Sequence, residues 1–233
     1  TAVAGMGGIG KTTLAAEYCH RFGGRYAGVW WVRAEQEMTM LADLAALGQR
    51  LGLPPSGNVE NDARAVLEQL GCVTEPWLLV YDNAPNPDAV RQWLPVGAVR
   101  AIITSRFTEF GELAPVTCVD QWPDAVTAEY LLARTERKDA DGAARLAKTL
   151  GGLPLAAEQA AAFLRPRKGV SFDDYAKEIA RLIKRKRDAG ITGEYPDTVY
   201  AAFVTSLETL QAMQAGDIAL DLLRLCAFLS PDG

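Results

Sequence analysis

The chain opens with a glycine-dense stretch that ends in lysine and threonine. Residues 5–15 read GMGGIGKTTLA, and the spacing Gly5-x-x-x-x-Gly10-Lys11-Thr12 fits the phosphate-loop pattern at every specified position. Glycines leave the backbone N–H groups free to converge on an anion, because no side chain stands in the way. In this pattern the lysine reaches the β- and γ-phosphates and the threonine ligates Mg²⁺. The stretch therefore predicts a site for a nucleoside triphosphate.

The flanking residues provide the strand and the helix that a phosphate loop requires. Residues 1–4 read as the end of a buried strand, and residues 13–18 contain helix formers with Leu14 and Tyr18 one turn apart. A helix beginning under the phosphates favours negative charge, because its first N–H groups are unpaired and its dipole is positive there. A flexible glycine turn before a helix is the alternative, and the complete pattern in this context disfavours it. We expect the nucleotide to contact Gly7, Gly8, Ile9, Gly10, Lys11, Thr12 and Thr13.

Two later apolar runs end in side chains that would complete such a site. Residues 77–81 lead into Asp82, and residues 99–103 lead into a segment that ends at Arg106. We expect Asp82 to end the strand next to the phosphate loop, where a carboxylate supports the Mg²⁺ shell through water. Arg106, expected one strand further on, would contact the γ-phosphate and so distinguish ATP from ADP. Asp82 and Arg106 are thus the candidate catalytic residues, against the alternatives of a turn acid before Pro85 and an ordinary ion pair.

Strand and helix patterns alternate along the first half of the chain. Further strands are expected at 28–33, as a run covered on both faces, and at 116–119, with helices at 38–51 and about 62–70. Parallel strands need crossover connections, so this alternation predicts a parallel, doubly wound α/β sheet over residues 1–124. Ligands bind such sheets at the carboxyl ends of the strands.

Beyond about residue 124 the strand patterns stop and helices follow. They are expected at 126–137, 141–150, 153–164 and 171–187, with two more between 198 and 229. Composition therefore predicts a helical subdomain over 125–190, a linker at 190–196 and a third segment over 191–233.

The helix expected at 171–187 carries signals at both of its ends. Ser171 is the predicted N-cap with Asp174 three residues on, and the predicted apolar face holds Ala176, Ile179, Ala180 and Ile183. The basic run at 184–187 resembles a nucleic-acid patch. Cations in a last helical turn complement the negative end of the helix, and this interpretation is the favoured one.

Composition excludes several classes of protein. With 233 residues, of which 49% are hydrophobic and 23% charged, the chain is ordinary for a globular protein of two or three units. The net charge of −5 argues against general nucleic-acid binding without excluding a local basic patch. No apolar run approaches the roughly 20 residues needed to cross a bilayer, so no membrane partner is expected. Four scattered cysteines indicate a reducing cytoplasm, and one histidine excludes most histidine-based sites.

Four motifs, in this order and spacing, resemble the NB-ARC domain of STAND-class signalling ATPases. They are GMGGIGKTTLA at 5–15, LLVYDNA at 78–84, IITSR at 102–106 and GLPLA at 152–156. The Gly-Leu-Pro-Leu element makes the resemblance specific, because generic phosphate-loop proteins lack it. Ala201, Phe203, Ser206 and Leu207, with residues 222–229, further resemble the entry into the winged-helix subdomain of that family. The resemblance therefore implies a P-loop sheet, a helical ARC1-like subdomain and an incomplete winged helix.

The resemblance also implies a function and the residues that serve it. In this family ADP holds the domains closed, and exchange for ATP opens the protein to oligomerise and to activate an attached effector. The implied cofactors are ATP or ADP with Mg²⁺. The implied partners are further copies of the protein and flanking effector and sensor or repeat domains, with no nucleic acid bound directly by this segment. By resemblance, Lys11 and Thr12 bind phosphate and magnesium, Asp82 supports the metal, Arg106 senses the γ-phosphate, and Pro154 packs on the adenine.

Three departures from the family pattern limit this inference. The chain begins inside a strand, without an initiator methionine or a signal sequence, so we expect an excised segment that lacks the upstream adenine contacts. The winged helix is expected to end before its histidine sensor. Where many relatives carry a second acid, this chain has Asn83, whose amide accepts no proton at neutral pH, so hydrolysis is expected to be slow.

Three alternatives remain open from the sequence. The first is a STAND transcriptional regulator in which a flanking domain binds DNA. The second is a P-loop small-molecule kinase, which would need an arginine-bearing lid and an acceptor pocket, and neither is recognisable. The third is a scaffold with a degenerate site, which the intact phosphate loop disfavours.

Overall fold

The chain divides after residue 120 in the computed structural model. One unit comprises Thr1–Asp120 and the other Gln121–Gly233. The structure describes residues 1–193, 196–212 and 216–226. The three-part division into 1–124, 125–190 and 191–233 stays a prediction. Parts of the expected linker and winged-helix entry, including Leu229, lie outside the described residues.

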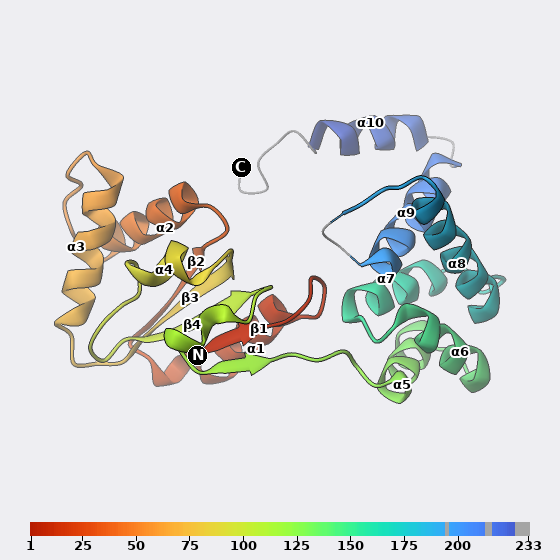
Figure 1. Ribbon diagram of the computed structural model, residues 1–233, viewed down its shortest axis with the longest axis horizontal. Helices are drawn as coiled ribbons and strands as arrows, with labels where there is room; N and C mark the ends of the chain where they lie inside the picture. Colours follow the sequence, from red (N-terminus) through yellow and green to blue (C-terminus); the bar gives the residue numbers. More distant parts are fainter. Residues whose placement is uncertain (194–195, 213–215, 227–233) are drawn as a thin grey trace. The chain divides into compact units, whose positions relative to one another are not determined.

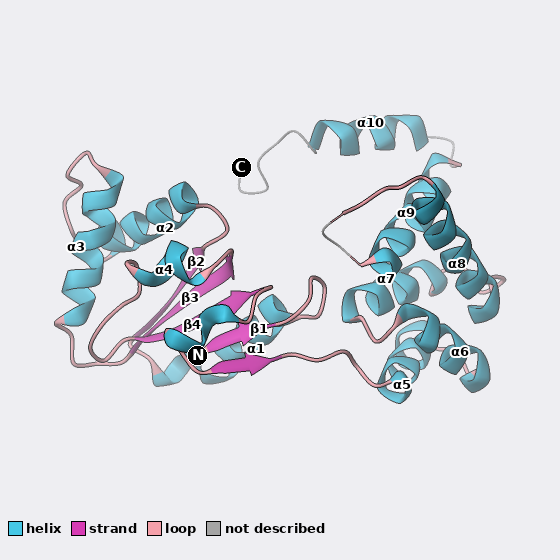
Figure 2. Cartoon of the chain, viewed as in Figure 1, coloured by secondary structure: helices cyan, strands magenta, loops and turns pink. Residues whose placement is uncertain are grey.

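Five parallel strands form the sheet of the first unit (Figures 1 and 2). They are β1 (Ala2–Ala4), β2 (Gly28–Arg33), β3 (Trp77–Ala84), β4 (Arg100–Ser105) and β5 (Val116–Cys118), in the order β2-β3-β4-β1-β5. The prediction of a parallel α/β sheet is confirmed. The expected positions of β3 and β4 are wrong, because β4 lies beside β1 and β3 lies one strand further on. Crossover connections set this order, and no local pattern records it.

Alternate side chains of β3 reach the two faces of the sheet. Leu79 and Tyr81 belong to the core packed by α2 (Glu37–Arg50) and α3 (Val59–Gly71), together with α4 (Pro87–Arg91). Leu78 and Val80 pack instead against Ala15 of α1 (Lys11–Phe22) on the other face. The short 3-10 segments are η1 (Gly23–Arg25) and η2 (Glu109–Glu112). This alternation explains the continuous apolar run of β3, since a strand covered on both faces needs apolar residues at every position.

β2 is one of the two edge strands, and its residues are less buried than those of a central strand. Val32 is buried, whereas the other residues of β2 are partly exposed. Both faces of β2 are nevertheless packed as predicted, because Trp30 and Val32 join the α2 side and Val29 and Trp31 the α1 side, although only Val32 is fully buried. Asp43 of α2 fastens this edge, because its carboxylate receives the guanidinium of Arg33 at 2.7 and 2.9 Å and its carbonyl receives the indole N–H of Trp30 at 2.9 Å.

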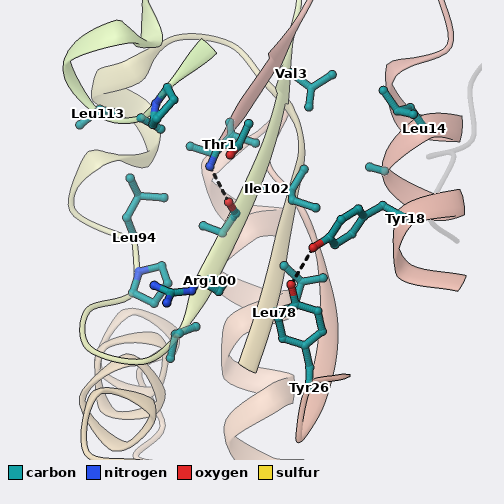
Figure 3. A pocket seen from close by; sticks show the side chains of 17 residues that line it. Thr1, Val3, Leu14, Tyr18, Tyr26, Leu78, Leu94, Arg100, Ile102 and Leu113 are labelled. Atoms are coloured by element: carbon teal, nitrogen blue, oxygen red, sulfur yellow. Dashed lines mark hydrogen bonds between the residues drawn. The ribbon is translucent and has the colours of Figure 1, made fainter. Parts of the chain in front are cut away.

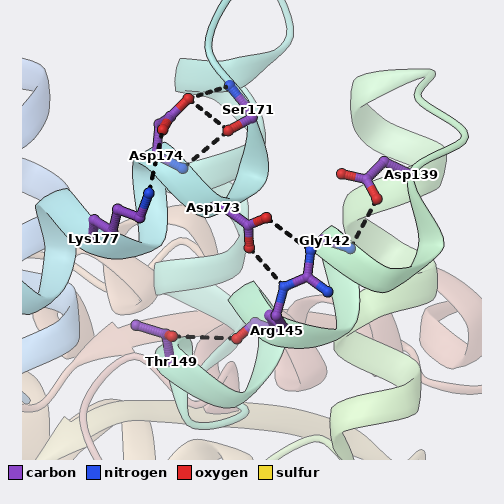
Figure 4. Close-up of polar contacts among 8 residues, drawn as sticks. All are labelled: Asp139, Gly142, Arg145, Thr149, Ser171, Asp173, Asp174 and Lys177. Carbon is purple, nitrogen blue, oxygen red and sulfur yellow. Dashed lines mark hydrogen bonds and ion pairs between the residues drawn. The ribbon is translucent and has the colours of Figure 1, made fainter.

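The second unit is built from helices throughout its described residues. They are α5 (Asp124–Thr135), α6 (Ala140–Leu150), α7 (Pro154–Leu164), α8 (Phe172–Asp188), α9 (Asp197–Gln211) and α10 (Gly216–Cys226). The predicted cap of α8 is confirmed, because the amide of Asp174 donates to Ser171 Oγ at 3.0 Å (Figure 4). Arg145 of α6 pairs with Asp173 through two bonds of 2.7 Å in the same view. No helix among the described residues is long and apolar enough to cross a membrane.

The buried face of α8 differs from the predicted one. It holds Phe172, Tyr175, Ile179, Leu182 and Lys186, so the predicted Ala176, Ala180 and Ile183 lie beside it rather than on it. Phe172, Tyr175, Ile179 and Leu182 follow the i, i+3, i+7, i+10 spacing of one helix face, and Lys186 continues that face although it is charged. A hydrophobicity pattern counts lysine as polar, and only a partner of opposite charge offsets the cost of burying it.

That partner is Asp197, at the start of α9. The ammonium of Lys186, with 4% of its side chain exposed, donates to Asp197 Oδ1 at 2.9 Å and lies 4.8 Å from the centre of the Tyr200 ring. Arg187 bonds the second oxygen of Asp197 at 3.1 Å, and Arg185 pairs with Glu208 at 2.8 Å. These cations hold the pKa of Asp197 below its usual value, with the Lys186 bond the largest cause. Arg185, Lys186 and Arg187 lie in the last turn of α8, where the favoured interpretation expects them, and they also connect α8 to α9.

Replacing Asp197 with Ala leaves the Lys186 ammonium buried without its carboxylate. We expect the free energy of unfolding of the second unit to fall by about 2 kcal/mol, the value typical of a missing bond to a charged group. Hydrogen exchange of the α8 and α9 amides measures this unit by itself. The matched control is Asp188→Ala, an exposed acid at the end of α8, the helix that carries Lys186, with an expected change below about 0.5 kcal/mol. Equal effects of the two variants would contradict the prediction.

Candidate nucleotide site

The phosphate loop joins β1 to α1 through backbone conformations that favour glycine. Gly5, Gly8 and Gly10 have φ angles of +155°, +78° and +96°. A Cβ on Gly5 would also lie 2.8 Å from the carbonyl oxygen of Val119, closer than real Cβ atoms approach. Gly5, Gly8 and Gly10 are thus required by the shape of the loop.

Lys11 is the first residue of α1 and lies inside the loop that precedes it. Its side chain is buried, and its ammonium donates to the carbonyl oxygens of Gly5 at 2.8 Å and Met6 at 2.9 Å. Burial lowers the pKa of Lys11, and the positive charge of Arg106 lowers it further, while the carboxylate of Asp82 opposes the shift. Both charged groups therefore lie within electrostatic reach of the lysine. Gly10 provides no side-chain cap for α1, so the helix presents its positive end at the loop.

Asp82 reaches the start of α1 although β4 separates its strand from β1. Thr12 Oγ1 donates to Asp82 Oδ1 at 2.9 Å. The pairing of β3 with β4 is irregular between Tyr81 and Ala84, and Asn83 has a φ angle of +61°. Asparagine tolerates this left-handed conformation better than most residues. The irregularity places the carboxylate at the edge of the sheet where the phosphate loop also lies.

Arg106 directly follows β4 and is anchored by its neighbour in the chain. The carbonyl of Ser105 accepts the amide of Gly5 at 3.2 Å. The hydroxyl of Ser105 donates to the carbonyl of Ala84 at 2.8 Å and accepts the amide of Phe107 at 3.1 Å. Arg106 therefore leaves the sheet between the phosphate loop and the strand end that carries Asp82.

The oxygen atoms at this edge fit a magnesium ion. Thr12 contributes a hydroxyl and Asp82 a carboxylate, both hard oxygen ligands, and they lie within hydrogen-bond distance of each other. Where the structure describes the chain, no group of three or more His, Cys, Asp or Glu residues is placed to hold a metal ion. Mg²⁺ needs no such cage, since it keeps several waters and binds through one or two protein oxygens plus the phosphates.

The structure brings most of the predicted residues to one edge of the first unit. They are Gly7, Gly8, Gly10, Lys11, Thr12, Asp82 and Arg106. The side chain of Ile9 is buried beneath the loop, near Gly5, and that of Thr13 is exposed on α1. Pro154 is the first residue of α7 in the second unit, and its contact with adenine stays a prediction.

Two residues of the site were not predicted from the sequence. Thr104 and Ser105 hold the strand ends together through their hydroxyl groups, as the bonds to Asp82 and Ala84 show. The signal that could have found them is a pair of hydroxyl residues at the end of an apolar strand, immediately before the candidate arginine.

A cavity of about 690 Å³ lies elsewhere in the first unit (Figure 3). Leu14 and Tyr18 of α1, Ile102 of β4 and Leu94 are among the residues that line it, and the Tyr18 and Tyr26 hydroxyls meet there at 2.8 Å. None of the predicted site residues lines this cavity. The candidate site therefore rests on the loop and the strand ends.

The phosphate loop and the parallel sheet define a P-loop NTPase fold. More particularly, the family model described as the NB-ARC domain matches residues 1–83, which carry the phosphate loop and β3 up to Asn83. The regulatory protein AfsR of Streptomyces griseus is 31% identical to this chain, over 92% of the chain's length. The chain spans 23% of the length of that relative.

Two solved structures show weaker likeness. One is a Signal Transduction ATPase with Numerous Domains protein with a tetratricopeptide repeat sensor, from Pyrococcus horikoshii, at 20% identity and a TM-score of 0.45 over 68% of this chain and 26% of that one. The other is Cdc6p of Pyrobaculum aerophilum, at 14% identity and a TM-score of 0.48 over 82% of this chain and 56% of that one. The fold assignment rests on strand order and loop geometry instead.

Replacing Lys11 with Ala should weaken nucleotide binding without unfolding the chain. Each charge-assisted hydrogen bond from the ammonium to a phosphate is worth about 1.5 to 3 kcal/mol, so we expect affinity to fall roughly ten- to hundredfold. Titration calorimetry with ADP and ATP measures this. Lys148→Ala removes an exposed lysine from the second unit and is the control. Equal affinity of the Lys11 variant and the parent would refute the phosphate-loop assignment.

Proposed function

We propose that this chain is the ATP- and ADP-binding switch module of a larger STAND signalling protein. The observation that carries the proposal is the convergence of Lys11, Thr12, Asp82 and Arg106 at one edge of a parallel sheet. Two cations, a hydroxyl and a carboxylate in this arrangement match the charges of a nucleotide phosphate chain with its magnesium ion. The NB-ARC match and the relationship to a regulatory protein support the same function.

In this proposal each residue has a separate task. The loop amides of Gly7 to Gly10 and the ammonium of Lys11 bind the phosphates. Thr12 ligates Mg²⁺, and Asp82 supports the metal shell through water. Thr13 lies beside the phosphates at the start of α1, and Pro154 packs on the adenine.

Arg106 accounts for the difference in affinity between ATP and ADP. It lies within electrostatic reach of Lys11, so a γ-phosphate held by the lysine would lie near a second cation. ADP has no γ-phosphate and therefore cannot interact with Arg106 in this way. Exchange of ADP for ATP would then favour the conformation that oligomerises and activates a flanking effector in the cytoplasm, because only differential affinity shifts such an equilibrium.

A second candidate function is the nucleotide-binding core of a STAND transcriptional regulator. The observation in its favour is that the matched relative is named a regulatory protein. The two candidates share the site and differ in the flanking domain. The sequence on either side of this segment in its gene tests them, since a DNA-binding module would support the regulator and a protease-like or TIR-like module the signalling effector.

Replacing Arg106 with Gln should lower the affinity for ATP and leave that for ADP unchanged. A guanidinium bond to phosphate is worth about 1.5 to 3 kcal/mol, or roughly ten- to hundredfold in affinity. Titrations of both nucleotides in excess Mg²⁺ give the ratio of affinities. Arg100→Gln changes an exposed arginine at the other end of β4 and should leave the ratio unaltered. A parallel decrease for ATP and ADP would show that Arg106 does not read the γ-phosphate.

Asn83 bears on the rate of hydrolysis. We expect fewer than roughly one turnover per minute for the monomer, far below the typical enzyme range of about 1 to 1000 per second. Asn83→Asp supplies a group that orients or deprotonates water, so the rate should rise about 10²- to 10⁴-fold. Single-turnover measurements with ATP test this.

The control for this prediction is Asn83→Gly. Glycine adopts the φ angle of +61° at this position and removes the amide, so the variant should keep the slow rate of the parent. Fast hydrolysis by the parent, or no gain in Asn83→Asp, would show that another residue orients the water.

A further inference from the structure

The hydroxyl of Thr104 lies at the junction of β3 and β4. Thr104 Oγ1 donates to Asp82 Oδ1 at 2.5 Å and accepts the backbone amide of Asn83 at 2.8 Å. Its side chain is 1% exposed, so bulk water does not compete for these bonds. A buried hydroxyl thus joins two consecutive residues of β3 at the site where that strand is irregular.

The two bonds fix the direction in which the hydroxyl proton points. Threonine has one O–H to donate, and an ionised carboxylate only accepts. Because the Asn83 amide occupies the acceptor side of the oxygen, the proton is directed to Asp82. The β-branch of threonine restricts rotation about χ1, which keeps the hydroxyl in this orientation.

Asp82 Oδ1 receives a second hydroxyl, that of Thr12, at 2.9 Å. If Thr12 ligates magnesium, its oxygen must face the metal, and its bond to Asp82 is weakened or broken. Thr104 then remains as the donor that holds the carboxylate in place. A carboxylate accepts about four hydrogen bonds, so Asp82 retains capacity for a metal-bound water.

We propose that Thr104 is a positioning residue that orients Asp82 toward the magnesium shell of the bound nucleotide. The proposal rests on the proposed nucleotide function and extends it to a residue outside the phosphate loop. Thr104 contacts neither the metal nor the nucleotide in this role. It acts by holding the carboxylate and by anchoring Asn83 in its left-handed conformation.

The first experiment measures how ADP affinity depends on Mg²⁺. Thr104→Val keeps the shape of the side chain and removes the hydroxyl. Removing a group that orients a metal ligand typically costs about 10- to 100-fold in metal affinity, so the Mg²⁺ concentration at half-effect should rise by that factor. Affinity for ADP in EDTA should match the parent, and Thr104→Ser, which restores a hydroxyl, should recover most of the Mg²⁺ effect.

Thr117→Val is the matched control, because it makes the same chemical change at an exposed position of β5 in the same sheet. It should leave the Mg²⁺ dependence of ADP binding unaltered. An unaltered dependence in Thr104→Val, or an equal decrease in affinity with and without Mg²⁺, would overturn the proposal.

The second experiment needs no nucleotide. Hydrogen exchange of the Asn83 amide should accelerate about tenfold or more in Thr104→Val and remain slow in Thr104→Ser, because only a hydroxyl accepts that N–H. Unchanged exchange in Thr104→Val would overturn the positioning role even if nucleotide binds. A parent chain that exchanges as expected but binds no nucleotide would instead refute the proposed function.

Discussion

The position of β4 between β1 and β3 is the constraint on which the site depends. Parallel strands end at the same edge of a sheet, so the phosphate loop, Arg106 and Asp82 all emerge there. Ser105 connects the end of β4 to both neighbours: its carbonyl accepts the amide of Gly5, in the phosphate loop, and its hydroxyl donates to the carbonyl of Ala84, in β3. Thr104 adds the bond to Asp82. The end of one strand thereby fixes the relative positions of the lysine, the arginine and the carboxylate.

This arrangement places two positive charges, Lys11 and Arg106, where they can bind the phosphates of a nucleotide. Burial lowers the pKa of Lys11 and the positive charge of Arg106 lowers it further, so the two cations oppose each other in the folded protein. A polyanion between them would relieve that repulsion. In the second unit, by contrast, cations serve the fold itself, as Lys186 does with Asp197 and Arg137 does by donating to the carbonyls of Leu164, Val170 and Arg167.

The features that could be predicted from sequence are those encoded locally. The phosphate loop, the cap of α8 and the alternation of strands and helices follow from neighbouring residues, and the structure contains all three. The order of β3 and β4 was predicted wrongly, because crossover connections and distant contacts determine it. The burial of Lys186 escaped prediction for the same reason, since its partner lies eleven residues away on another helix. Thr104 can be recognised as a hydrogen-bond partner of Asp82 only when β3 is known to lie beside β4.

The same arrangement of strand ends limits which residues can distinguish ATP from ADP. A ligand shifts a conformational equilibrium only by its differential affinity for the two states, and ADP and ATP differ only in the γ-phosphate. In the proposed site the loop amides would bind phosphates common to both nucleotides, so their contribution would be largely shared, whereas Lys11 would contact both the β- and the γ-phosphate. A residue that faces the γ-phosphate and is also tied to the framework must carry the difference. Arg106 meets the second condition through Ser105, which links it to β1 and β3 at once. In the proposed switch, the difference in binding free energy between ATP and ADP therefore comes from the interaction of the γ-phosphate with Arg106, at the end of β4.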